Sequence, residues 1–530
     1  MKDKDLPNIF GAEGEYQGIL LEAEISSNMN NVVKLVVEMA QADPGILEEI
    51  DHDLDLHGLK KKAGRQADLR FVEEQNPVLD GFKNSMPPLS CSLELEPGRP
   101  RMPAIVVLVL LLLRGWIGGP KSSTYQLILR ESMTLHHFLH QHGCKVPGPS
   151  TVTDNISAVR ISTLRRILPA QLAHARNLRL DNFEEIQFDS TAVHANSKYP
   201  TESGLMAALA MRFTGVFKRI KDLKLGLPDW VTRKAAEQSR QIAEGIESNA
   251  KSIGMLSGKR NATTKRKEHY AKCYTRVARL VRVFTPTFCL MKEAIAHVPL
   301  PPSKVRVVQE LLHECEQDLE SIAKISTYSR QRIFRDKQTP TSEKVHSVSD
   351  EDAAIIRKGG REDVFGYRPQ LVFSGKGLVI AHCLPKGNAA DSGQLLHIIE
   401  ESERNTGVIP KCLNGDDGYT NSKVRNEYLS KHEGIVDVFS FSGSKGRKAI
   451  GEEVYMSEEY KKARKNRSAV ESRIFTIKFN HGYEDVMRRG HENVEHEQLT
   501  KCLSYNVRRI VWLKKAKLRA EREADLKKVA

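Results

Sequence analysis

The sequence predicts an α/β protein in which a mixed β-sheet is preceded by an all-α region and interrupted by a helical insertion. Three observations carry this prediction. Residues 102–178 have helical periodicity without strand signals. A strand follows near residue 186, after which residues 205–345 have the pattern of long helices with basic faces. From residue 366, strands and helices alternate, as is typical of a mixed sheet with helices on its faces.

The first region of the chain is expected to be helical and of unclear role. Residues 1–95 are acidic at their start and rich in proline near their end, and helices are predicted at about 27–42 and 44–60. The apolar run at residues 104–113 is ten residues long, against about 20 for a membrane-spanning helix. It therefore predicts a buried helix at the start of the second region, and no membrane partner.

The later elements follow from local signals. The "SGKG" turn between two β-rich runs predicts a hairpin of residues 370–373 and 378–384. A helix, a short strand that ends in "NGDDGY", a second helix and another strand are then predicted, at residues 388–405, 408–416, 422–432 and 434–442. The expected parts of the chain are therefore a region of unclear role (1–95), a helical domain (96–180), a sheet core in two pieces (184–204 and 366–515), a basic helical insertion (205–365) and a basic tail (516–530).

Composition narrows the class of protein. The 530 residues are 40% hydrophobic and 28% charged, which indicates a soluble globular chain of two to four structural units. The start of the sequence has no signal-peptide pattern. The eight cysteines are scattered without a CxxC pair, which argues against a disulfide framework and against a cysteine-rich zinc site. These features predict a cytoplasmic setting.

The charge of the chain is uneven. The net charge is +14, yet residues 1–60 hold 13 acids and 4 Lys or Arg. Residues 257–282 hold 9 Lys or Arg and one acid, and residues 501–530 hold 10 and 3. A polyanion is therefore expected to bind the middle and the end of the chain, with nucleic acid as the first choice and an anionic membrane surface as the second. The alternative for each basic run is a solvated helix face.

Two aspartates leave predicted strands. Asp189 ends the apolar-leaning run in "EEIQFDSTAVHAN", and Asp416 ends a later strand in "NGDDGY", where Gly415 and Gly418 are expected to let the backbone turn sharply. Ligand-handling residues tend to lie at such strand ends. The alternative for Asp189 is a solvent-facing position on a half-buried strand.

A third acid, Glu471, lies in a predicted helix. Arg467, Glu471 and Lys478 fall on one side of it, and an adjoining apolar stripe is expected to pack on the sheet. The stripe comprises Val470, Ile474 and Ile477. The alternative for Glu471 is a surface pair with Arg467, which would contribute only about 0.2 to 0.5 kcal/mol. Lys478 is about 10.5 Å along the axis from Glu471, so it must face another partner.

If the three acids lie close together in the fold, repulsion between their carboxylates restricts the functions that they can have. Two carboxylates about 4 Å apart repel by roughly 4 kcal/mol at an effective dielectric constant near 20. Divalent cations remove this repulsion, and oxygen ligands without a Cys/His set favour Mg²⁺ or Mn²⁺. Two such ions can activate the attacking oxygen and stabilise the leaving oxygen of a phosphodiester displacement.

At these residues the chain resembles a DDE transposase of a bacterial insertion sequence, of the ISNCY-type group or a close relative. "FDSTAVHANSKYPTESGLM" resembles the segment of the first catalytic Asp. "NGDDGYTNS" resembles the second, in which the catalytic Asp stands three residues before Tyr, and this selects Asp416 over Asp417. "RSAVESRIFTIKFNHGYEDVMRRG" resembles the third, with Glu471 catalytic. The resemblance covers about 96–170 and 184–515, in patches.

The resemblance implies an RNase H-like catalytic core and an enzyme that cleaves the inverted repeats at the element ends. Water frees a 3′-OH, which then attacks target DNA. Asp189, Asp416 and Glu471 would hold a two-ion Mg²⁺ site in which Mn²⁺ can substitute. A dimer on double-stranded DNA, near the bacterial nucleoid, is expected by analogy.

Further residues are matched to the family as DNA-binding or accessory residues. Arg467 and Lys478 match the Arg-(3)-Glu-(6)-Lys part of a related signature and are expected to contact DNA phosphate. Arg464 stands where that signature has Tyr. The positions expected to shape the pocket or contact DNA are Asn196, Tyr199 and Thr201. Two alternatives stay open: an RNase H-like nuclease that does not join strands, and an inactive transposase-derived DNA-binding protein.

Overall fold

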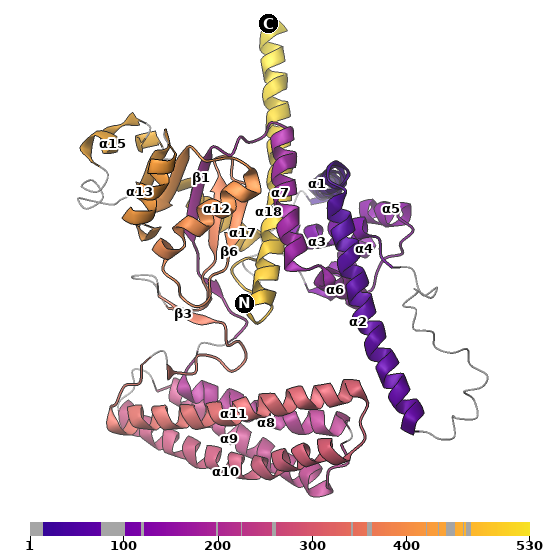
Figure 1. Cartoon of the computed structure of the whole chain (residues 1–530), viewed down its shortest axis with the longest axis vertical. Coiled ribbons are helices and arrows are strands. Elements are labelled where there is room, and N and C mark those ends of the chain that lie inside the picture. Colours follow the sequence, from indigo (N-terminus) through magenta and orange to yellow (C-terminus); the bar gives the residue numbers. More distant parts are fainter. Residues whose placement is uncertain are drawn as a thin grey trace, which may run out of the picture. The chain divides into compact units, whose positions relative to one another are not determined.

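The protein was examined as a computed structural model, which divides into two compact units (Figure 1). Unit 1 comprises Met1–His57, Glu96–Asn196 and Ala354–Ala530, and unit 2 comprises Gly58–Leu95 and Ser197–Ala353. The structure describes residues 14–75, 101–117, 121–197, 200–223, 225–256, 261–340, 343–357, 363–419, 421–432, 434–440, 451–458, 460–462 and 468–529.

Helices alone precede the first strand in the described residues. They are α1 (Gly14–Ala42), α2 (Gly45–Gln75), α3 (Ala104–Trp116), α4 (Ser122–Glu131), α5 (Met133–Gln141), α6 (Pro149–Ala158) and α7 (Ile161–Asn177). The predicted all-α region is thus confirmed, and the first two helices are longer than predicted. The apolar run forms α3 as expected, and its residues from Val106 to Leu113 are at most 1% exposed. No described helix has the length and apolar character needed to cross a membrane.

A five-stranded mixed sheet forms the centre of unit 1. Its order is β6-β5-β1-β7-β8. β1 pairs antiparallel with β5 and parallel with β7, β5 pairs antiparallel with β6, and β7 pairs parallel with β8. The strands are β1 (Glu185–Ser190), β5 (Gln370–Ser374), β6 (Val379–Cys383), β7 (Cys412–Asp416) and β8 (Val436–Ser440). The predicted mixed sheet and its hairpin are confirmed.

A small second sheet, which was not predicted, contains the short strand β2 that follows β1 in the chain. Its order is β2-β4-β3, with β2 (Val193–His194), β3 (Ala354–Ile356) and β4 (Val364–Tyr367). β4 pairs antiparallel with both neighbours. β3 and the first two residues of β4, which were predicted to belong to the helical insertion (205–365), are therefore strand residues of unit 1.

Helices cover the free edge of the sheet at β6. Asn506 of α18 (His491–Val529) accepts a hydrogen bond from Val379 N at 2.7 Å and donates one to Val379 O at 2.8 Å. Asn405 of α12 (Leu395–Thr406) donates to Ile380 O at 2.9 Å. These side chains satisfy backbone groups that an open edge would expose. The remaining helices of this part of unit 1 are α13 (Ser422–Lys431), α15 (Glu452–Met456) and α17 (Ser468–Asn480).

Unit 2 has its own hydrophobic core, formed by long helices that lie side by side (Figure 1). They are α8 (Glu202–Leu223), α9 (Ala236–Gly254), α10 (Ala262–His297) and α11 (Pro302–Arg335). Their core is apolar and aromatic, with Phe213 packed 4.5 Å, between ring centroids, from Phe284. The core of unit 2 is therefore separate from the core that includes the five-stranded sheet.

Candidate active site

Two aspartates end neighbouring parallel strands. Gln187 of β1 pairs with Asn414 of β7, and the same register, continued by two residues, sets Asp189 beside Asp416. Adjacent strands lie about 4.8 Å apart, and residues at the same register of parallel neighbours share a face of the sheet. Both aspartates are half-buried. The structure therefore brings the first two predicted acids to one edge of the sheet.

Gly415 has a role that the sequence did not indicate. It lies inside β7 and not in a turn, whereas Gly418 lies in the tight 3-10 turn Asp417–Tyr419 as expected, and neither glycine adopts a positive φ. A Cβ on Gly415 would lie 2.1 Å from Cε2 of Phe188 on β1. A Cβ on Gly418 would lie 3.0 Å from Oδ1 of Asp416 and 3.1 Å from Oδ2 of Asp391. Both glycines make room for neighbouring side chains.

A buried polar network supports this strand end from the other face. Asp391, 6% exposed, pairs with Arg368 and accepts hydrogen bonds from Ser190 Oγ at 3.2 Å and Gln370 Nε2 at 3.0 Å. The hydroxyl of Tyr419 donates to Gln370 Oε1. The network therefore joins the end of β1, the start of β5 and the turn after β7. No local pattern in the sequence indicates this role of Asp391, because its partners are remote in sequence.

The same region carries an excess of negative charge. Tyr419 is fully buried, and its pKa is raised well above the usual 10, first by burial and then by Asp391, Asp189 and Asp416, while Arg368 opposes the shift. Arg368 already pairs with Asp391. Asp189 and Asp416 thus supply two hard oxygen donors in an acidic setting, and these donors fit a divalent cation such as Mg²⁺.

The helix that carries Glu471 packs on the face of the sheet that bears these aspartates. On α17 the predicted apolar stripe is buried, with Val470 3%, Ile474 9% and Ile477 0% exposed. Arg473 of α17 donates to Gln187 Oε1 at 2.6 Å, and Gln187 shares the β1 face of Asp189.

Glu471 itself is exposed. Among the described residues no three Asp, Glu, His or Cys side chains are placed so that they could hold a metal ion. The structure therefore puts Glu471 on a helix that packs on the same face of the sheet as Asp189 and Asp416, but does not assemble the three acids into one ligand cluster.

The accessory residues fall in different places. Lys478 is mostly buried, and its Nζ lies 3.1 Å from Glu484 Oε1, so Glu484 is the partner that the spacing from Glu471 required. Thr201 belongs to unit 2, where its Oγ1 accepts from Gly204 N at 3.1 Å at the start of α8. Three further predicted positions lie outside the described residues: Tyr199, Arg464 and Arg467.

Asn196 joins the strand that follows β1 to the loop between α17 and α18, residues 481–490, hereafter the connecting loop. Its Nδ2 donates to Met487 O at 2.6 Å, and Arg489 Nε donates back to Asn196 O at 3.0 Å. His194 N also donates to Glu484 O at 2.8 Å. Asn196 therefore positions the connecting loop, a role that sequence reasoning did not anticipate.

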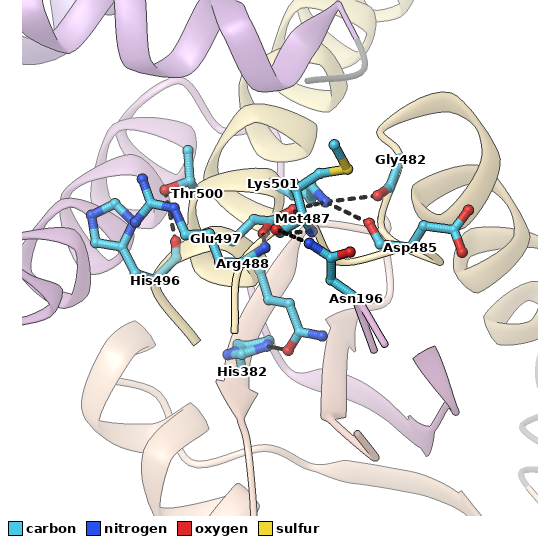
Figure 2. Close-up of polar contacts among 11 residues, drawn as sticks. Asn196, His382, Gly482, Asp485, Met487, Arg488, His496, Glu497, Thr500 and Lys501 are labelled. Atoms are coloured by element: carbon cyan, nitrogen blue, oxygen red, sulfur yellow. Dashed lines mark hydrogen bonds and ion pairs between the residues drawn. The ribbon is translucent and has the colours of Figure 1, made fainter. Parts of the chain in front are cut away.

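A buried ion pair holds the connecting loop against α18 (Figure 2). Lys501 Nζ lies 2.6 Å from Glu497 Oε1, and these side chains are 7% and 11% exposed. Lys501 also donates to Gly482 O at 2.7 Å. Glu497 accepts from the backbone N–H groups of Met487 at 3.0 Å and Arg488 at 2.9 Å. The loop after α17 is thus fixed at both ends by charge-assisted hydrogen bonds.

Residues 439–511 match a protein family described as "Transposase DDE domain". The match supports a DDE transposase. It spans α17, the connecting loop and most of α18, and it includes Glu471 and Lys478. Neither a curated protein nor a solved structure matches the chain. The predicted resemblance to DDE transposases is confirmed, while the ISNCY-type group stays a prediction.

Within this DDE segment the structure shows an aromatic pair that sequence reasoning missed. Phe475 and Phe479 are 61% and 58% exposed, and their ring centroids are 4.3 Å apart. They follow Glu471 at four-residue intervals, so all three lie along one side of α17. The signal was present in "ESRIFTIKFN", where both rings fall off the apolar stripe. Exposed aromatic rings are typical surfaces for nucleobases.

Removing the Tyr419 hydroxyl should weaken the fold at the strand ends. In Tyr419→Phe, Gln370 Oε1 loses its donor in a buried site. We expect the free energy of unfolding to fall by about 1 to 3 kcal/mol. Urea unfolding of the two proteins measures this difference, and a loss of less than about 0.5 kcal/mol would contradict a structural role for the network.

Three buried histidines predict sensitivity to acid. Burial lowers the pKa of His382, His481 and His496 to about 4, from the usual 6.5. The unfolded chain therefore binds more protons than the folded chain between these values. Their stabilisation is complete above pH 6.5 and is lost as the pH falls toward 4, by up to about 1.4 kcal/mol per pH unit for each histidine.

Urea midpoints measured as a function of pH test this expectation. The midpoint should be flat above pH 6.5 and should decline between pH 6.5 and about 5, where model carboxylates are still mostly ionised. A midpoint that stays constant over that interval would show that the three imidazoles do not contribute as their burial requires.

Proposed function

We propose that the chain is a transposase that cleaves DNA at insertion-sequence ends and joins the freed 3′-OH to target DNA. The proposal is carried chiefly by one observation, the placement of Asp189 and Asp416 side by side at the ends of parallel strands, under the helix that bears Glu471. The family match, which includes Glu471, supports it. The mixed sheet supports an RNase H-like core.

Asp189, Asp416 and Glu471 would hold Mg²⁺, or Mn²⁺ in its place. When bound, such ions activate an attacking oxygen and stabilise the leaving oxygen in phosphodiester displacement. The protein's own contribution is to fix the positions of the two aspartates. The hydrogen bonds among Asp391, Gln370 and Tyr419 stabilise the ends of the strands from the opposite face of the sheet. Because Glu471 is exposed on α17, we infer that binding of DNA and metal brings it to the aspartates.

The DNA is proposed to lie over the exposed side of α17. Arg467 and Arg464 precede Glu471 and would contact phosphate close to the cleaved strand. Lys478 would also contact phosphate, for which it would have to exchange its partner Glu484 for the DNA. Asn196, Tyr199 and Thr201 would be accessory residues that contact DNA. The enzyme would act as a homodimer on double-stranded DNA in a bacterial cytoplasm, with residues 96–180 taking part in DNA binding or assembly.

Strand transfer separates this proposal from its alternatives. Duplexes that carry the DNA flanking the coding sequence, already cut to expose the 3′-OH, would be incubated with supercoiled plasmid and Mg²⁺. The proposed enzyme should produce joined products. A nuclease would yield nicked plasmid without joining, and an inactive descendant would bind the duplex without either product.

A further inference from the structure

An arginine-lined trough runs between α10 and α11 of unit 2. It consists of two neighbouring cavities of about 600 and 670 Å³, both of which are lined by Tyr274, Ala278 and Arg330. Its lining residues include four arginines and no acid, among the described residues. The arginines are Arg279, Arg282, Arg330 and Arg335.

These arginines differ from several other arginines of unit 2. Arg212, Arg219, Arg306 and Arg332 each pair with a carboxylate of unit 2. None of the four trough arginines has a carboxylate within ion-pair distance in the part of the chain that the structure describes. All four are exposed. Like charges gathered without a counter-charge repel one another, so the trough is electrostatically suited to an anion.

The floor of the trough is ordered. Tyr274 is 5% exposed, and its hydroxyl donates to Ser329 Oγ at 3.0 Å. The guanidinium of Arg330 lies 4.9 Å from the centre of the Tyr274 ring, and the Phe334 ring is 6.3 Å from it. Stacking on a fixed ring restricts the guanidinium before any ligand binds, which lowers the entropy lost on binding.

The positive charge extends beyond the trough along α10. Lys265, Lys272 and Arg279 are all exposed, and their seven-residue spacing puts them along nearly one side of the helix, with one exposed acid, Glu268, between the first two. From Lys265 to Arg282 this line of charge is roughly 25 Å long at 1.5 Å per residue. A line of cations fits a linear polyanion better than a compact ligand.

We propose that this trough is a binding site for the phosphate backbone of duplex DNA, separate from the strand-end carboxylates. Arginine forks bind phosphate oxygens in pairs, and each neutralised phosphate releases counterions. Only the choice of DNA among linear polyanions rests on the proposed function. The trough would hold DNA without reading its sequence.

The test measures binding of a fluorescent duplex of arbitrary sequence to the full chain over a series of salt concentrations. EDTA is present, so cleavage does not enter. In the Arg279→Gln, Arg282→Gln, Arg330→Gln, Arg335→Gln variant we expect the affinity at low salt to fall at least about tenfold. The slope of log K against log [salt] should become less negative by about 3 to 4, since each phosphate contact contributes about 0.9 to this slope.

The matched control replaces paired arginines of the same unit. Arg240 pairs with Glu237 and Glu244, and Arg306 pairs with Glu310. Arg240→Gln with Arg306→Gln should change the salt dependence by less than about 1. Since no described carboxylate loses a partner in the trough variant, its thermal unfolding midpoint should not fall.

A charge-conserving variant keeps the test decisive if the glutamine variant folds poorly. Replacing the same four residues by Lys should retain most of the salt dependence. The proposal is overturned if the glutamine variant keeps the wild-type salt dependence of DNA binding, or if the lysine variant loses it. Binding of the same variants to phosphatidylserine vesicles is measured in parallel. The proposal is also overturned if the substitutions weaken vesicle binding and leave DNA binding unchanged. These binding outcomes can be interpreted even if the chain does not catalyse strand transfer, because none of them depends on catalysis.

Discussion

Replacing either strand-end aspartate by asparagine should reduce Mg²⁺-dependent DNA cleavage by on the order of 10³-fold. Asp189→Asn and Asp416→Asn keep the shape of the side chain and remove a negative charge that a divalent cation needs. DNA affinity in EDTA should stay within about twofold of wild type, since loss of one charge changes the salt-dependent term little. Cleavage of end-bearing duplex, measured under single-turnover conditions, gives the rate.

Glu185→Gln is the matched control for this pair. Glu185 lies on the same strand and face as Asp189, but at the opposite end of β1. It should retain the wild-type cleavage rate. Full activity in Asp189→Asn or Asp416→Asn would remove that residue from the proposed site, and equal losses in all three variants would indicate damage to the strand instead.

Breaking the buried Glu497–Lys501 pair should have the largest effect on stability. In Glu497→Ala, Lys501 stays buried without its charged partner, and two backbone N–H groups of the connecting loop lose their acceptor. We expect the free energy of unfolding to fall by about 3 to 5 kcal/mol. Urea unfolding followed by tryptophan fluorescence suits this test, since Trp116 and Trp512 both belong to unit 1.

An exposed pair on the same helix provides the comparison. Lys528 and Asp525 of α18 are each 76% exposed and 3.5 Å apart, so Asp525→Ala should cost less than about 1 kcal/mol. Similar losses in the two variants would contradict the view that the buried pair holds the connecting loop. A loss confined to Glu497→Ala would support it.

Much of the sheet followed from short-range signals. The "SGKG" turn fixed the β5–β6 hairpin, and the alternation after it gave α12, β7, α13 and β8 in the correct order. The apolar stripe of α17 was also predictable, because its three residues repeat with helical period and are buried. Strand-end position drew attention to Asp189 and to the Asp416–Asp417 pair, and the resemblance to DDE transposases then selected Asp416.

The parts that were missed depend on contacts between distant residues. Asp391 meets Ser190 only because β1 and the turn before α12 come together in the fold, and nothing near either residue signals that contact. The role of Gly415 likewise depends on Phe188, which lies on the neighbouring strand. β2 precedes residues 197–353 in the sequence and β4 follows them. Their pairing therefore joins residues far apart in the sequence, which no local pattern could indicate.

The carboxylate site is tested most directly by locating the metal. A crystal structure of the full chain with cleaved-end duplex and Mn²⁺, read from the anomalous scattering of manganese, gives the ligands without assumption. The account predicts manganese bound to oxygen atoms of Asp189, Asp416 and Glu471, at about the 2.0 to 2.2 Å typical of small divalent cations. Manganese bound elsewhere, or a site that Glu471 does not join, would contradict it.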